Sequence, residues 1–206
     1  MPGSKVPEEL RRRQILAAAY RVAGERGLAD TTILQVAAEA NVSPGLVSFH
    51  FESRRKLILS LLEELLATTT VLQADVRLPP SATPEARLLA VLRQEIQRLT
   101  SEPVRIRLTF DFWMAGVRDP ETRDRLQAEF ARYREAFRPL AEAVLRAHPE
   151  RFPGVTADGL AGLSVSLIKG CAVQSMIDPD NFDVDQYFTA ATGLLSGAGQ
   201  GAPAPR

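Results

Sequence analysis

The stretch that decides the fold runs from residue 31 to residue 51 and reads TTILQVAAEANVSPGLVSFHF. Thr32 and Gln35 have the spacing of a capping box, in which a hydroxyl and an amide satisfy two free N–H groups at a helix start. Val36, Ala37 and Ala40 follow at helical spacing and give that helix one apolar face. The sequence therefore predicts a short helix over about 33–40.

A second short helix is predicted directly after a sharp turn. Asn41 can adopt the left-handed backbone conformation that such a turn requires. Ser43 fits an N-cap, and Pro44 fits the first helical turn, where its missing N–H is not needed. Val47 and Phe51 then point inward from a helix over 44–51. Two short helices joined in this way form a helix-turn-helix.

The outward side of the second helix is the candidate DNA-binding surface, because the second helix of such a motif lies in the major groove. Helix N-termini favour phosphate, and flanking arginines supply backbone contacts. The residues predicted to bind DNA are Arg11, Arg12, Arg13, Thr31, Thr32, Ser43, Pro44, Gly45, Leu46, Ser48, Phe49, His50 and Arg54. Residues 1–57 carry nine Lys and Arg against six Asp and Glu, although the whole chain is neutral. The basic clusters are also compatible with a plain solvated surface.

The rest of the chain also predicts helices, so the fold class is all-α. Apolar residues recur every three to four positions, and no strand-like alternation occurs. We expect a first helix over 8–26 ending at Gly27 and a fourth from Arg54 into the 70s. Further helices are expected at 84–100, 103–117, 120–147, 156–177 and 183–195, with a kink or early break at Pro139. The expected domains are a three-helix DNA-binding domain at 1–53, a helical ligand-binding and dimerisation domain at 54–196, and a disordered tail at 197–206.

Other classes of protein are disfavoured by the composition. No apolar stretch approaches the length of a membrane span, and the first ten residues lack a signal-peptide core, so a cytoplasmic location is expected. One cysteine and two histidines make a metal site improbable, and no cofactor is predicted. An all-α enzyme would need a nucleophile–base pair or a metal site, and a helical adaptor would not need a capped helix-turn-helix.

The run from Arg12 to Leu62 resembles the DNA-binding domain of the TetR family. The resemblance rests on Gly27, Thr32-Ile33, Val36-Ala37, Ala40, Val42-Ser43, Gly45, His50-Phe51, Arg54 and Leu57. Asn41 replaces the common glycine, and Ser48 replaces a tyrosine that contacts phosphate in the family. Residues 43–48 with Phe51 are most similar to the choline-responsive BetI-type branch. The resemblance implies a homodimeric repressor that binds an inverted-repeat operator and is released by a small-molecule effector.

Two regions of the second half attract attention. Aromatic residues gather in two neighbouring predicted helices, where they form either a packed core or a ligand pocket. An acid among aromatics, Asp111, suits a cation, but Arg107 four residues earlier could pair with it. The candidate ligand-binding residues are Asp111, Trp113, Met114, Phe130, Tyr133, Phe137, Cys171 and Gln174, of which the last two could instead be core.

The second region is the stretch 159–177, which is apolar on more than one face. Leu160, Leu163 and Leu167 share one side, and Val165 and Ile168 lie on another. A helix that is apolar all round is either central or at an interface. With the final helix it resembles the helix pair that forms the TetR-family dimer interface.

Overall fold

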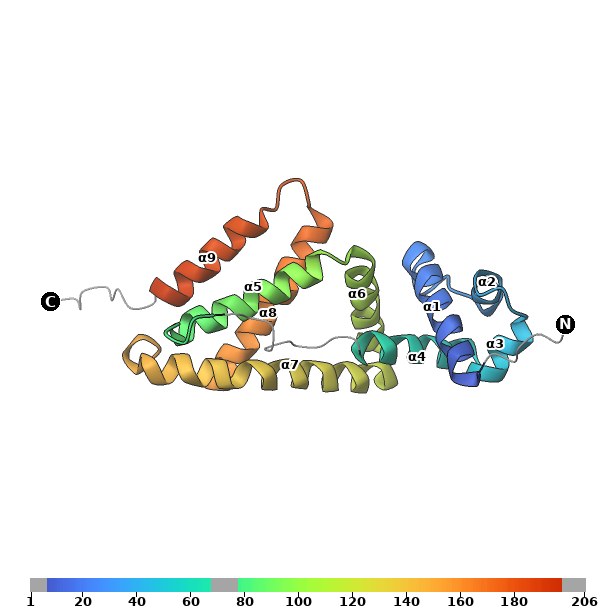
Figure 1. Cartoon of the computed structure of the whole chain (residues 1–206), viewed down its shortest axis with the longest axis horizontal. Helices are drawn as coiled ribbons and strands as arrows, with labels where there is room; N and C mark the ends of the chain where they lie inside the picture. The colour runs from blue at the N-terminus through green and yellow to red at the C-terminus, as the bar shows by residue number, and fades with distance from the viewer. Residues whose placement is uncertain (1–6, 68–77, 198–206) are drawn as a thin grey trace. The chain divides into compact units, whose positions relative to one another are not determined.

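The computed structural model describes residues 7–67 and 78–197, and every regular element in these two ranges is a helix (Figure 1). The helices are α1 (Glu8–Arg26), α2 (Ile33–Glu39), α3 (Pro44–Phe51), α4 (Arg54–Ala67), α5 (Pro84–Thr100), α6 (Pro103–Arg118), α7 (Pro120–Ala147), η1 (Pro149–Arg151), α8 (Ala157–Ile177) and α9 (Val184–Gly197). The all-α prediction is confirmed. The end expected for the fourth helix in the 70s and the tail from residue 198 lie outside the described residues.

At Pro139 the sequence predicted either a kink or an early break of the helix. Helix α7 continues through Pro139, so the early break predicted there was wrong. Proline removes one N–H···O bond from a helix. Phe137, Ala141 and Val144, which flank the proline, are all fully buried. Packing on the buried side therefore holds the helix together across the missing bond.

Contacts between Cα atoms divide the chain into two compact units. Unit 1 comprises the described residues up to 67 together with 107–126, and unit 2 comprises 78–106 and 127–197. The division passes through α6 and α7, so each of these helices contributes to both units. The domain boundary predicted between Ser53 and Arg54 separates two functions, whereas the two units are defined by contacts. That boundary therefore stays a prediction.

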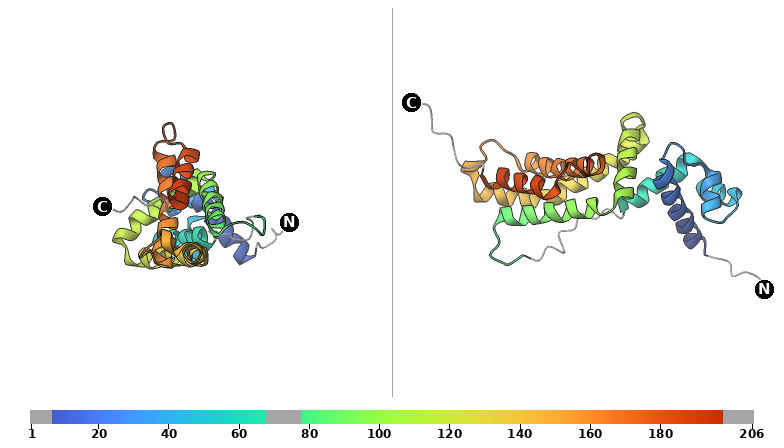
Figure 2. Two further views of the ribbon diagram at one scale, coloured as in Figure 1. Left: turned by 90° about the vertical axis from the view of Figure 1, so that its left-hand side faces the viewer. Right: turned by 90° about the horizontal axis from the view of Figure 1, so that it is seen from above.

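Unit 1 is built around the helix-turn-helix. Helix α1 packs on α2 and α4, and α3 packs on α2 and α4 (Figures 1 and 2). Of the positions that the apolar spacing predicted to face inward, Val36, Ala37, Val47 and Phe51 are buried and Ala40 is half-buried. The buried side chains of α1 include Ile15, Ala19, Val22 and Ala23. Local backbone features also agree with the sequence, because Thr32 and Gln35 form the full capping box and the Ser43 hydroxyl accepts from the Leu46 N–H.

Unit 2 packs α5 against α8, and α9 contacts both helices. By length and composition alone, α8 is long and apolar enough to cross a membrane, contrary to the sequence expectation. Leu160, Val165, Ile168 and Cys171 are nonetheless buried against the rest of the chain. One side of α8 therefore lies in the core, in agreement with the first of the two interpretations that the sequence analysis gave for its apolarity.

The left-handed turn at Asn41 allows a test of whether the backbone conformation of this residue stabilises the helix-turn-helix. Asn41 has φ 53° and its side chain is exposed, so a substitution there changes the backbone preference and little packing. We expect Asn41→Val to lower the free energy of unfolding by about 1–2 kcal/mol, since a branched residue disfavours this region. Asn41→Gly should leave it within about 0.5 kcal/mol. Urea unfolding measures both, and equal stabilities would contradict the turn's dependence on residue 41.

Candidate functional site

Helix α3 presents a small, exposed outward face. Val47 and Phe51 anchor the helix in the core, while Gly45 and Ser48 are exposed and Phe49 is 73% exposed. Of the other predicted contact residues on this motif, Ser43 and Pro44 are exposed and Leu46 and His50 are half-buried. Phe49 and His50 pack edge to face with their ring centroids 5.3 Å apart. An exposed phenylalanine on an otherwise small surface favours contact with a partner.

The two threonines before α2 differ in their availability. The Thr31 side chain is fully buried, and its hydroxyl donates to the Gly27 carbonyl at 2.8 Å. The prediction that Thr31 contributes its side chain to a phosphate contact therefore needs correction. Thr32 is exposed at the N-terminus of α2, where free N–H groups favour an anion. Thr32 alone of the pair keeps its side chain on the surface.

Arg54, which was predicted to contact DNA, also makes hydrogen bonds within the fold. Its guanidinium donates to three main-chain carbonyls between α1 and α2: Nε to Thr31 O at 2.5 Å, and one terminal nitrogen to Leu28 O at 2.5 Å and Ala29 O at 2.7 Å. These bonds tie the start of α4 to the connection that leads into α2. Loss of this arginine therefore affects the shape of the motif as well as its charge.

The three arginines at the start of α1 also differ. Arg12 lies 4.7 Å from the centre of the Phe51 ring and donates to the Ser60 hydroxyl at 3.0 Å, so it links α1 to α3 and α4. Arg13 is exposed and lies 3.8 Å from Glu9. Arg11 donates to Gln14 at 3.0 Å. Among the three, Arg13 is the least engaged with the fold.

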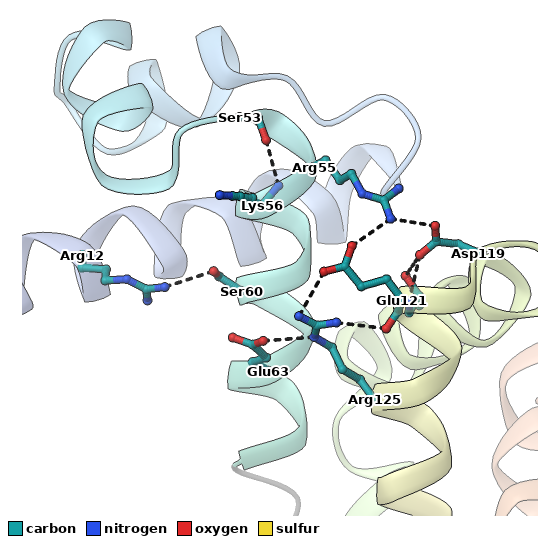
Figure 3. Close-up of polar contacts among 10 residues, drawn as sticks. Arg12, Ser53, Arg55, Lys56, Ser60, Glu63, Asp119, Glu121 and Arg125 are labelled. Atoms are coloured by element: carbon teal, nitrogen blue, oxygen red, sulfur yellow. Dashed lines mark hydrogen bonds and ion pairs between the residues drawn. The ribbon is translucent and has the colours of Figure 1, made fainter.

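A cluster of ion pairs joins α4 to the start of α7 within unit 1 (Figure 3). Arg55 contacts Asp119 and Glu121 at 2.9 Å each, and Arg125 contacts Glu63 at 3.0 Å. Asp119 also accepts from the Thr122 hydroxyl at 2.6 Å. We call these residues the α4–α7 clamp. Sequence analysis missed the clamp because its partners lie more than sixty residues apart and carry no local signal.

Unit 1 also contains a hollow of about 420 Å³. Its walls come from the α1–α2 connection, α4, α6 and the start of α7, and its lining residues are Gly27, Leu28, Ala29, Arg54, Ile58, Asp111, Phe112, Met114, Ala115 and Thr122. The lining is largely apolar, with one carboxylate. Asp111 makes no hydrogen bond or ion pair with another described residue, so the alternative pairing with Arg107 does not form. Of the predicted ligand residues, Asp111 and Met114 line this hollow.

The remaining predicted ligand residues lie apart from the hollow. Trp113, also in unit 1, packs edge to face on Phe110 at 4.7 Å. In unit 2, Tyr133, Phe137 and Cys171 are buried, and burial raises the pKa of the Cys171 thiol. Phe130 is half-buried, whereas Gln174 is exposed on α8. Burial in unit 2 agrees with the core interpretation for Tyr133, Phe137 and Cys171.

Helices α8 and α9 carry apolar side chains that are exposed among the residues the structure describes. Leu163 is 50% exposed on α8, Leu194 is 74% exposed on α9, and Ile177 is exposed at the end of α8. The exposed positions around them are small or polar, among them Ser166, Ala190 and Gly193. Exposed leucines on two helices that pack together favour contact with a protein partner.

A capped helix-turn-helix followed by an all-helical second half defines a DNA-binding regulator with a separate sensing region. Comparison with known proteins agrees. The family model for bacterial regulatory proteins of the tetR family matches residues 15–61. The model for the C-terminal part of BetI-type transcriptional repressors matches residues 84–197, more than half of the chain. The chain therefore belongs to the TetR family and has a BetI-type C-terminal half.

Individual relatives cover three quarters or more of the chain. The transcriptional regulator BetI of Cronobacter sakazakii is 26% identical over 189 residues, 91% of this chain and 90% of that protein. BetI of Burkholderia thailandensis is 30% identical over 155 residues, 75% and 78% of the two chains. A regulator from Saccharomonospora viridis, solved in complex with choline, has a TM-score of 0.72 at 20% identity and covers 92% of this chain and 97% of its own. The protein is a DNA-binding transcriptional regulator and not an enzyme.

The clamp gives a test based on pKa. Hydrogen bonds from the Thr122 hydroxyl and N–H, and then from Arg55, lower the pKa of Asp119 to about 2. Since this pKa lies below the ordinary 3.8, the stabilisation from ionised Asp119 is present above about pH 4 and is lost as the pH falls towards 2. We expect Thr122→Val to raise the pKa of Asp119 more than Arg55→Gln does, measured by carboxyl ¹³C NMR titration. The reverse order would mean that the ion pair, and not the threonine, sets this pKa.

Proposed function

We propose that the protein is an effector-responsive repressor that acts as a homodimer on an inverted-repeat operator in the cytoplasm. The outward face of α3 carries the proposal, because Gly45, Ser48 and Phe49 are exposed on a helix whose other side is locked in the core. The major groove admits one helix, and small residues let its backbone approach the bases. Phe49 would contact thymine methyl groups or sugars.

Phosphate contacts would come from the N-termini of the short helices and from the exposed arginines. Thr32 and Ser43 are the exposed N-caps of α2 and α3, and the N-terminus of a helix favours an anion. Arg13 and the remaining free donors of Arg54 would flank the groove. Ser48 offers a shorter reach than the tyrosine common in the family, so one backbone contact should be weaker here.

The exposed leucines of α8 and α9 support a two-fold contact with a second copy of this chain. Such a contact places the same surface on both subunits. Dimerisation fixes the distance between the two copies of α3, and therefore the spacing of the operator half-sites. An effector lowers DNA affinity only if it binds better to an arrangement with the wrong spacing.

The hollow in unit 1 is our candidate effector site. Its walls join the α1–α2 connection to α6, so a ligand there touches the helix-turn-helix unit directly. The unpaired carboxylate of Asp111 suits a cationic head group, and the apolar walls suit its aliphatic part. The choline complex of the Saccharomonospora viridis regulator makes choline a reasonable first probe.

DNA binding is tested with Gly45→Glu. A Cβ built at Gly45 has only the Ser43 hydroxyl at 4.0 Å nearby, and an acid suits the first turn of a helix, so the fold should be unchanged. The added charge would face phosphate, and we expect affinity for duplexes selected from a random pool to fall by about tenfold or more, equal to about 1.4 kcal/mol. Gln97→Glu, an equal charge change at an exposed residue of unit 2, is the control. Recovery of no enriched inverted repeat at low salt would refute the proposal itself.

Dimerisation is tested with Leu163→Arg and Leu194→Arg. Because both leucines are exposed in the single chain, arginine should not unfold it, but it would place an unpaired charge in the interface. We expect light scattering at micromolar concentration to report a dimer for the wild type and a monomer for the variants. Val117→Arg, at a 65% exposed residue on α6, should stay dimeric. A monomeric wild type would be decisive against this surface.

The effector site is tested with choline and its uncharged isostere 3,3-dimethylbutan-1-ol. Trp113 is the chain neighbour of Phe112 and Met114, which line the hollow. We expect choline to change Trp113 fluorescence and to weaken operator binding over the same concentration range, with a coupling of about 1–3 kcal/mol. Asp111→Asn should reduce affinity for choline and leave that for the alcohol unchanged, since only the charge is removed. If the substitution affects both ligands equally, Asp111 does not provide charge recognition.

A further inference from the structure

The core of unit 2 contains an unusual concentration of charge. Glu95 on α5, Glu129 and Tyr133 on α7, and Lys169 on α8 are each 8% exposed or less. Arg98, one turn after Glu95, is mostly buried as well. Taking ionised groups out of water is unfavourable, and their mutual attraction offsets this only with good geometry. Apolar side chains stabilise a helical core without this desolvation cost. The charged cluster therefore needs a physical explanation.

The cluster consists of two parts that meet at Tyr133. On one side, Arg98 contacts the Glu95 carboxylate at 2.8 Å and donates to the Tyr133 hydroxyl at 2.9 Å. On the other side, Lys169 Nζ lies 3.7 Å from Glu129 Oε1 and 4.4 Å from the centre of the Tyr133 ring. The Lys169 ammonium thus sits between a carboxylate and an aromatic face. Burial lowers the pKa of Lys169, while Glu129 opposes that effect.

A carboxylate beside an aromatic face is the arrangement with which proteins bind organic ammonium groups. Here the ammonium belongs to the chain itself. A second observation points to a binding site: the other carboxylate oxygen of Glu129, Oε2, is buried and accepts no hydrogen bond from any described residue. A purely structural ion pair in a core would be expected to satisfy both oxygens.

We propose that Lys169 fills an organic-ammonium site in the core of unit 2 and thereby closes that site to free cationic ligands. Lys169 is then a specificity-determining residue, because its side chain is a tethered equivalent of n-propylammonium bound to Glu129 and Tyr133. The inference concerns the core of unit 2 and does not depend on the effector site proposed in unit 1.

Two physical effects keep the site closed. The two carboxylates are balanced by Arg98 and Lys169, so an additional cation would leave the buried cluster with a net positive charge. The tethered ammonium also competes at an effective concentration of about millimolar or more, as linked binding groups do. A free cation at micromolar concentration therefore does not displace it. Cationic effectors are directed away from this part of the core.

The test removes the tethered ammonium and supplies it from solution. Lys169→Ala deletes a fragment equal to n-propylammonium, and we expect that variant to melt at a lower temperature than the wild type. Adding n-propylammonium chloride should restore its melting temperature with saturation, and at least tenfold less of it should be needed than of 1-propanol. The wild type should not respond at equal ionic strength. Lys169→Met, which keeps the stem and therefore leaves no space, should not respond either.

Each outcome decides the proposal. Equal rescue by the alcohol and the ammonium, or an equal response of the wild type, would overturn it. If Lys169→Ala does not fold alone, recovery of its helical circular dichroism by n-propylammonium and not by 1-propanol supports the site, and failure of both refutes it. Glu129→Gln combined with Lys169→Ala should abolish the preference for the ammonium. No DNA is present in these measurements, so their result is separate from that of the proposed repressor function.

Discussion

The geometry of the helix-turn-helix depends on the bonds that Arg54 makes. The connection between α1 and α2 leaves carbonyl groups at Leu28, Ala29 and Thr31 that no helix pairs, and one guanidinium binds all three. Arginine suits this task because its donors are fixed in a planar fork and its charge is permanent. Arg54 is also the first residue of α4, so the same side chain sets where α4 begins relative to α2. The orientation of α3 follows, since α3 packs on both helices.

The basic residues near the motif therefore differ in what they contact. Arg12 and Arg54 hold the helices together through Phe51, Ser60 and the three carbonyls, whereas Arg13 remains largely in solvent. Arg55 instead pairs with Asp119 and Glu121 in the clamp. A count of basic residues thus overstates the charge that is free for phosphate. The local net charge near the motif supports DNA binding less strongly than the shape of α3 does.

The sequence predicted the parts of the fold that local rules control. The capping box at Thr32 and Gln35, the left-handed Asn41 and the N-cap Ser43 each depend on residues within a turn of one another, and all three are confirmed. It could not indicate that Thr31 turns inward, because the hydrogen bond from the Thr31 hydroxyl to the Gly27 carbonyl carries no local sequence signal. Nor could it find the clamp or the Lys169 cluster, whose members come from separate helices. Break prediction failed at Pro139 for a similar reason, since buried neighbours outweigh the local proline rule.

The hollow and the Lys169 cluster differ in whether their carboxylates are already paired with a cation. In the hollow, Asp111 is partly exposed and has no partner, so a cation that binds there gains an ion pair without displacing one. In the cluster, Glu129 already has a cation, and an incoming one must first remove it. In the cluster, the cost of desolvating the carboxylate is part of the free energy of folding. In the hollow, that cost arises only when a ligand binds. A cationic effector should therefore act through unit 1, which also contains α3.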